Sequence, residues 1–207
     1  IRRLLQVPQQ APSGTGISVA VIDTGFYPHP YYQGFSITRV AAPGSPAPEK
    51  DTSGHGTAIT MNVLTIAPAV DLFGIPQTDP PEVSLEVAFY ERHAKVITCS
   101  WGWNYEQAHS GVELMIRDIV QDGGIVLFAS GNGHYAWPGS MPEVISVGGV
   151  YANEQDQLQA SNYASGYMSS RYPTRRVPDF CGLCGQIPKA MYIPMPTQPK
   201  SEMDRSL

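Results

Sequence analysis

The segment Gly16-Ile17-Ser18-Val19-Ala20-Val21-Ile22-Asp23-Thr24-Gly25 decides the fold class of this chain. It begins with an apolar run that has the length of a buried strand, and it ends in a carboxylate and a turn-forming glycine. In open α/β sheets, functional side chains collect beyond the carboxyl ends of the strands. We therefore expect Asp23 to lie at such a strand end.

Further short apolar runs alternate with amphipathic stretches along the chain. We expect strands at 70–75, 95–99, 125–129 and 144–147, and helices at 57–66, 83–93 and 110–121. This alternation predicts βαβ units, and hence an α/β fold with a mostly parallel sheet and helices on both faces.

The composition excludes several classes of protein. The chain has 207 residues, of which 42% are hydrophobic and 15% are charged, which is typical of a folded domain. A net charge of -5 offers no basic surface for nucleic acid, and no apolar stretch reaches the roughly 18 residues that span a bilayer.

The chain begins at Ile1 without a Met, so either a leader was removed or the sequence starts internally.

The three cysteines, Cys99, Cys181 and Cys184, are too few and odd in number for a disulfide framework. Cys181 and Cys184 have the spacing of a redox pair or of half a zinc site. No second such pair exists and no His lies nearby in sequence, so ordinary buried or loop cysteines are favoured.

Two further polar residues stand between glycines. They are His55 in Ser53-Gly54-His55-Gly56-Thr57, and Asn132 in Ala129-Ser130-Gly131-Asn132-Gly133. A carboxylate that orients an imidazole base, together with an amide aimed at an oxyanion, is the equipment of acyl transfer by a serine hydrolase. We therefore expect the side chains of Asp23 and His55 to meet within hydrogen-bonding reach.

The order Asp-Thr-Gly, His-Gly-Thr, Ser-x-Gly and Ala-Ser-Gly-Asn closely resembles that of the subtilisin-like (subtilase) serine proteases. Ile66-Ala67-Pro68, the stretch 135–150 and Val177-Pro178-Asp179 extend the resemblance, which covers residues 15–186. It implies a serine endopeptidase that acts on a polypeptide. Asp23 would orient His55, His55 would act as general base and then general acid, and Asn132 would stabilise the oxyanion.

The resemblance also implies a substrate cleft with two walls, formed by Ser100, Trp101 and Gly102 on one side and by Ala129, Ser130 and Gly131 on the other. Packing is the alternative role for Trp101 and Trp103. No cofactor is required. The family often carries structural calcium, but no acidic loop specifies a site, and a choice of Asp71 or Asp79 would be arbitrary.

The family's nucleophile segment, Gly-Thr-Ser, does not occur after Asn132. Ser201 and Ser206 lack the preceding glycine, and the other late serines precede Val177-Pro178-Asp179; these are Ser161, Ser165, Ser169 and Ser170. Ala58 and Met61 also replace the family's usual His and Gly.

We therefore interpret residues 1–186 as a partial subtilisin-like catalytic domain, incomplete at its C-terminal end. Residues 187–207 are interpreted as a proline-rich exposed loop or tail that leads toward the nucleophile segment, which would lie on a second or missing fragment. One alternative is an inactive subtilase-like module that binds peptides. Another is metal chemistry at Asp23 and His55, which lacks a third ligand.

Localisation stays open, because the family is often secreted whereas an odd cysteine count favours a reducing compartment.

Overall fold

A computed structural model describes residue 8 and residues 11–106, 110–186 and 195–206. The chain divides into two compact units, each of which we describe by itself. The first unit comprises Pro12–Ser100, Ser110–Val126 and Pro194–Leu207, and the second comprises Ile1–Ala11, Trp101–His109 and Leu127–Ile193. The start at Ile1 and residues 187–194 of the expected tail lie outside the described residues.

The first unit contains a parallel sheet with strand β1 (Ser18–Asp23) inside it. β3 (Asp71–Pro76) and β4 (Val96–Cys99) flank β1, and β2 (Ile37–Arg39) pairs with the outer side of β3. Residues 19–22 of β1 are all buried, which explains why they form an unbroken apolar run rather than an alternating pattern. Asp23 is the last residue of β1, opposite Pro76 of β3, so the predicted strand end is confirmed.

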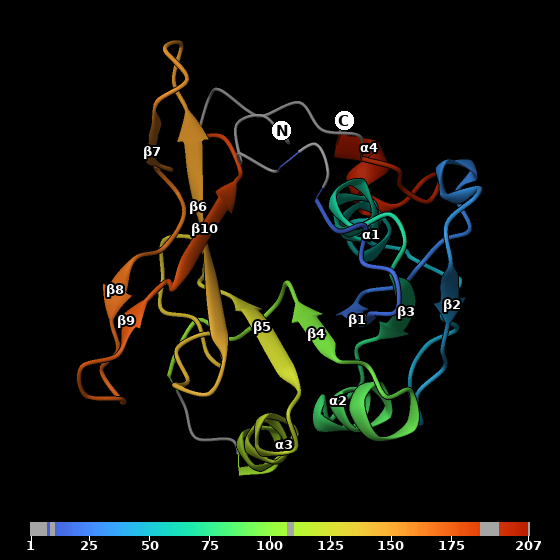
Figure 1. Cartoon of the computed structure of the whole chain (residues 1–207), viewed down its shortest axis with the longest axis horizontal. Coiled ribbons are helices and arrows are strands. Elements are labelled where there is room, and N and C mark those ends of the chain that lie inside the picture. The colour runs from blue at the N-terminus through green and yellow to red at the C-terminus, as the bar shows by residue number, and fades with distance from the viewer. Residues whose placement is uncertain (1–7, 9–10, 107–109, 187–194, 207) are drawn as a thin grey trace. The chain divides into compact units, whose positions relative to one another are not determined.

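Helices cover both faces of this sheet. α1 (His55–Ile66) lies on one side of β1 and β3, and α2 (Glu82–Glu86) lies on the other (Figure 1). α2 continues as a π-helical turn (Val87–Glu91), and α3 (Ser110–Gln121) buries Val112, Ile116 and Ile119. The predicted α/β class is therefore confirmed, with the expected helix at 83–93 divided between α-helical and π-helical turns.

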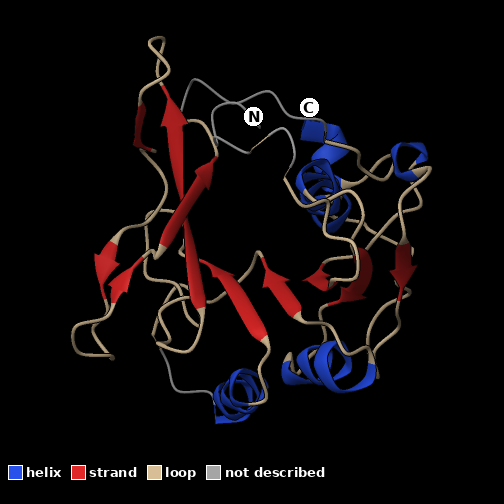
Figure 2. Ribbon diagram, viewed as in Figure 1, coloured by secondary structure: helices blue, strands red, loops and turns tan. Residues whose placement is uncertain are grey.

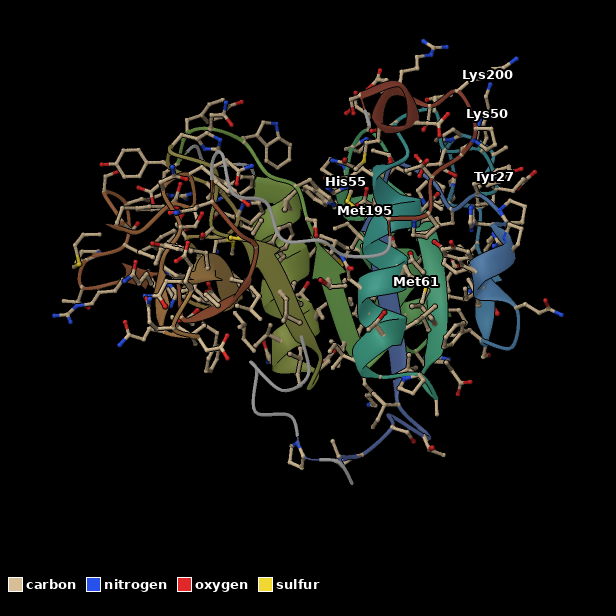
Figure 3. All side chains as sticks on the ribbon, turned by 90° about the horizontal axis from the view of Figure 1, so that it is seen from above. Tyr27, Lys50, His55, Met61, Met195 and Lys200 are labelled. Carbon is tan, nitrogen blue, oxygen red and sulfur yellow. The ribbon has the colours of Figure 1, made fainter. Side chains whose placement is uncertain are left out.

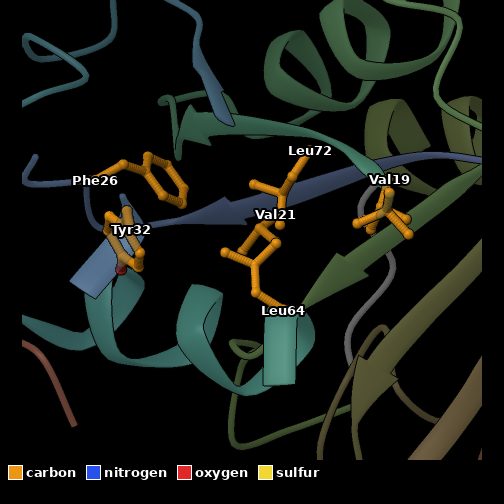
Figure 4. Close-up of a cluster of buried hydrophobic side chains, with 7 residues drawn as sticks. Val19, Val21, Phe26, Tyr32, Leu64 and Leu72 are labelled. Atoms are coloured by element: carbon orange, nitrogen blue, oxygen red, sulfur yellow. The ribbon is translucent and has the colours of Figure 1, made fainter. Parts of the chain in front are cut away.

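A cluster of seven apolar side chains holds α1 against β1 and β3 (Figure 4). It consists of Val19, Val21, Phe26, Tyr32, Leu64, Val70 and Leu72. Fully burying one such side chain contributes about 1.5–3 kcal/mol, so the cluster fixes the helix on the sheet. His55 begins α1 and Asp23 ends β1, so the same cluster sets the frame for both.

The second unit contains strands and turns but no helix over the residues that the structure describes (Figure 2). β5 (Ile125–Ala129) begins in the first unit and ends in the second, where it pairs in parallel with β6 (Ile145–Ala152). β10 (Phe180–Leu183) pairs in parallel with β6, and β7 (Leu158–Ala160) pairs antiparallel with it. β8 (Tyr167–Met168) and β9 (Arg176–Val177) form a separate antiparallel pair.

The described end of the chain differs from the exposed tail that we expected. Pro196, Thr197 and Ser201 are buried, and Glu202–Ser206 form the short helix α4. The backbone N–H groups of Glu202 and Met203 donate to carbonyl oxygens of Thr52 and Ser53. These bonds order a polar stretch that has no helical periodicity of its own. No helix among the described residues has the length and apolar character needed to cross a membrane.

Candidate active site

Asp23 and His55 are in direct contact in the first unit. The distance between His55 Nδ1 and Asp23 Oδ1 is 2.7 Å, which confirms the predicted proximity of the two side chains. Asp23 Oδ1 also accepts a hydrogen bond from the backbone N–H of Thr24, at 2.8 Å. The side chain of Asp23 is 2% exposed and that of His55 is 37% exposed, so a buried acid supports an imidazole that solvent can reach.

Two glycines allow α1 to approach the turn after β1. A Cβ atom on Gly56 would lie 2.3 Å from the carbonyl oxygen of Gly25 and 3.0 Å from Asp23 Cβ, so no larger residue fits there. Gly54 precedes His55 with a φ of 89°, a left-handed conformation that glycine adopts at little cost. The bracketing of His55 by glycines is thus a steric requirement of its closeness to Asp23.

Asp51 connects the segments that carry these two residues. It is fully buried, at 0% exposure. Its Oδ1 accepts from Thr24 Oγ1 and from the N–H of Gly54, both at 2.8 Å. Its Oδ2 accepts from the N–H of Thr57 at 2.9 Å and from Thr57 Oγ1 at 2.6 Å. Sequence reasoning missed Asp51, although an acid four residues before His55, in the loop leading to a helix start, was a usable signal.

The surroundings of His55 favour its charged form. The hydrogen bond to Asp23 raises the pKa of His55 above its ordinary value, while burial acts in the opposite direction. The negative charges of Asp23 and Asp51 raise it further.

Cys99, at the end of β4, is buried, and that burial raises the pKa of its thiol well above the usual range. Cys99 is therefore a neutral packing residue rather than a nucleophile.

Asn132 belongs to the second unit, where it is exposed on a tight turn. The flanking Gly131 and Gly133 have φ values of 104° and 81°, as the predicted turn requires. The buried Ser165 holds this turn: its Oγ accepts from the N–H groups of Gly133 and His134 at 2.9 and 3.1 Å. The same Oγ donates to the carbonyl oxygen of His134 at 2.7 Å. The sequence draws attention to Ser165 only as a candidate nucleophile and gives no sign of this structural role.

The residues expected to form the walls of the cleft are divided between the units. Ser100 follows β4 in the first unit, whereas the others lie in the second; these are Trp101, Gly102, Ala129, Ser130 and Gly131. Trp101 packs edge-to-face on Phe128, with 5.0 Å between ring centroids. Trp103 forms a backbone bridge with Trp137, and their rings lie 5.2 Å apart. Packing thus accounts for Trp103 and for part of the role of Trp101.

The backbone at Cys181 and Cys184 is too extended for a disulfide between them. Cys181 lies in β10, and the N–H of Cys184 continues the ladder by donating to Val150. Three residues of extended strand span about 10 Å, whereas a disulfide needs Cα atoms within about 7 Å. Cys181 and Cys184 therefore have the sequence spacing of a redox pair but lie too far apart to form its disulfide.

Loss of the Asp51 carboxylate should destabilise the first unit strongly. Asp51→Ala leaves four hydrogen-bond donors without their acceptor, and each buried unsatisfied donor costs about 1–3 kcal/mol. We expect the free energy of unfolding, measured by urea denaturation, to fall by more than the cost of one such group. Asp71→Ala, at an exposed carboxylate, is the control and should change it by no more than about 0.5 kcal/mol. Equal losses in the two variants would contradict the assigned role of Asp51.

The contact between Asp23 and His55 should make stability depend on pH. Because the pKa of His55 is raised on folding, its contribution is fully present below the unfolded value of about 6.5. That contribution is lost as the pH rises through the folded pKa. NMR titration should give a His55 pKa above 6.5 in the parent chain and a lower one in Asp23→Asn. Identical titration curves would show that the carboxylate does not act on the imidazole.

Ser165→Ala should loosen the turn that carries Asn132. The substitution removes the acceptor of two backbone N–H groups and the donor to a carbonyl, for a loss of about 1–3 kcal/mol. We expect faster hydrogen exchange at the amides of Gly133 and His134. Ser36→Ala, at an exposed serine, should leave those amides as they are in the parent chain. Unchanged exchange in Ser165→Ala would refute the assignment.

Comparison with known proteins agrees with the motifs. The profile of the subtilase family matches residues 14–176, and no curated protein matches the sequence significantly. One similar solved structure is the prenylagaramide maturation protease PagA, with 22% identity and a TM-score of 0.61 over 81% of this chain and 63% of that one. Another is the psychrophilic subtilisin-like protease Apa1 from the Antarctic psychrotroph Pseudoalteromonas sp. AS-11, with 14% identity and a TM-score of 0.59 over 74% of this chain and 42% of that one.

This chain spans less than two thirds of the length of either structure. At these identities the two structures show a shared fold, which is the subtilisin-like α/β fold that the motifs predicted. The family profile, in contrast, covers most of the sequence. The chain therefore belongs to the subtilase family.

Proposed function

We propose that this chain supplies the acid, the base and an oxyanion donor of a serine endopeptidase. The observation that carries the proposal is the 2.7 Å contact between His55 Nδ1 and Asp23 Oδ1, made by a buried carboxylate and a partly exposed imidazole. An ionised carboxylate can only accept a hydrogen bond, so Nδ1 carries the proton. Nε2 then keeps its lone pair, as a general base requires.

The attacking serine is proposed to come from a polypeptide outside this chain. Ser201 lies against Gly54 in the loop before His55, but it is only 1% exposed. Its Oγ accepts a hydrogen bond from the N–H of Asp204. Within the described residues, no hydrogen bond joins His55 to a serine. The nucleophile would therefore be a serine brought to Nε2 on a second fragment, and that fragment is the proposed protein partner.

The reaction follows from these roles. Nε2 of His55 takes the serine proton while the serine oxygen bonds to the carbonyl carbon of the peptide. The carbonyl electron pair becomes an oxyanion, to which the side-chain amide of Asn132 donates a hydrogen bond. When the C–N bond breaks, His55 returns the proton to the leaving amine. Water then releases the acyl group by the same steps, and Asp23 stabilises the imidazolium both times.

A fluorophosphonate probe on the protein purified from its source tests this proposal. Intact-mass analysis should find a co-purifying fragment with a Gly-Thr-Ser segment, and the probe should label the serine of that fragment. His55→Gln should abolish labelling because the base is lost, whereas His93→Gln, at an exposed histidine, should not. Asn132→Ala should lower kcat about 10²–10³-fold, the loss measured for such a donor in enzymes of the subtilisin type.

The other outcomes of this experiment contradict specific parts of the proposal. A label on a serine of this chain would overturn the separate nucleophile. An unlabelled protein that binds peptides without cleaving them would replace the protease with a catalytically inactive binding module.

A further inference from the structure

The described C-terminal residues hold the loop that leads to His55. The backbone N–H of Asp51 donates to Gln198 Oε1 at 2.7 Å. The N–H groups of Glu202 and Met203 donate to the carbonyl oxygens of Thr52 and Ser53, both at 2.9 Å. Three consecutive residues of the loop are thus hydrogen-bonded to one short segment of the chain.

Side-chain packing closes the same contact. Ser201 is buried against Gly54, where an added Cβ would lie 2.6 Å from Ser201 Oγ and 3.2 Å from Met203 Cβ. Lys50 and Lys200, which precede Asp51 and Ser201 in the sequence, lie at the same edge of the molecule (Figure 3). Gly54 is therefore enclosed by the C-terminal segment as well as constrained by its own backbone conformation.

The two segments complete each other's hydrogen bonding. The first N–H groups of a helix have no partner within the helix, and those of Glu202 and Met203 at the start of α4 find theirs in the loop. In return, the carbonyl oxygens of Thr52 and Ser53 receive donors that fix the loop on its outer side. On its inner side the loop is held by the Asp51 carboxylate, which binds the N–H of Gly54.

We propose that residues 198–203 form a clamp on residues 51–54, and that Gln198 and the backbone N–H of Glu202 are positioning residues for His55. This proposal rests on the proposed function, because it takes His55 to be the general base. The family profile ends at residue 176, so the clamp lies outside the part of the chain that the family accounts for. Its action on His55 is indirect, through the loop that delivers this residue to Asp23.

Two substitutions in the full chain open the clamp. Glu202→Pro removes the N–H that donates to Thr52, while proline is well tolerated at the first position of a helix. Its matched control is Glu202→Ala, which loses the same charge but keeps the N–H. Gln198→Leu removes the acceptor for Asp51 at similar size, and Gln198→Glu restores an acceptor oxygen.

Hydrogen exchange and NMR of His55 report the result without substrate or nucleophile. In Glu202→Pro and Gln198→Leu, the amides of Gly54 and Thr57 should exchange at least tenfold faster relative to amides of β1. The pKa of His55 should fall toward its ordinary value because the contact with Asp23 loosens. Asp23 and Asp51, the charged groups that act on His55, are intact in every variant. Glu202→Ala and Gln198→Glu should keep the exchange rates of the parent chain.

The clamp is refuted if both opened variants keep the parent's relative exchange rates and His55 titration. The same holds if they lose only thermal stability, since that would make the segment a general support. These readouts stay valid if the fluorophosphonate experiment fails, so failure of the protease proposal and failure of the clamp are distinguishable.

Discussion

The buried carboxylate of Asp51 is the constraint on which the arrangement of Asp23 and His55 depends. Asp23 is fixed by a strand, but His55 must be delivered by a loop, and loops owe their conformation to hydrogen bonds rather than to a regular ladder. One side chain supplies them here, with two bonds from backbone N–H groups and two from threonine hydroxyls. Because each carboxylate oxygen of Asp51 accepts two hydrogen bonds, the loop has one favoured position. In that position the imidazole of His55 contacts the carboxylate of Asp23.

In each unit, a buried side chain holds the backbone next to a more exposed polar residue, which is His55 in the first unit and Asn132 in the second. In the first, an acid of the loop binds backbone N–H groups on either side of His55. In the second, the hydroxyl of Ser165 binds consecutive N–H groups just after Asn132. Both holders are buried, and in both cases the group presented is more exposed than its holder. A buried hydrogen bond is not weakened by competing water, so each presented group is held rigidly from below while it stays accessible to solvent.

Much of this arrangement could be predicted from the sequence, because its signals are local. An apolar run that ends in Asp23 and a histidine between two glycines each reflect a backbone requirement that the structure contains. Ser165 and Gln198 could not be recognised in this way, since each binds backbone groups of a segment distant in the sequence, and such contacts impose no pattern on the sequence. Asp51 left a local signal, because it binds the backbone N–H groups of Gly54 and Thr57 in the following turn. The short strands β7–β10 escaped prediction for a related reason: they have two to four residues, too few for a period to show.

In the proposed mechanism, the contact that positions His55 also sets a limit on its use as a base. The hydrogen bond to Asp23 and the nearby charge of Asp51 stabilise the imidazolium, which is the form that His55 would reach as the proposed base once it takes a proton. The same interactions populate that form before any reaction, so a larger fraction of molecules has no lone pair on Nε2 at neutral pH. Burial opposes this effect by disfavouring the charge. For the proposed base, the partial exposure of His55 is therefore a compromise between stabilising the charged imidazolium and keeping the resting imidazole neutral.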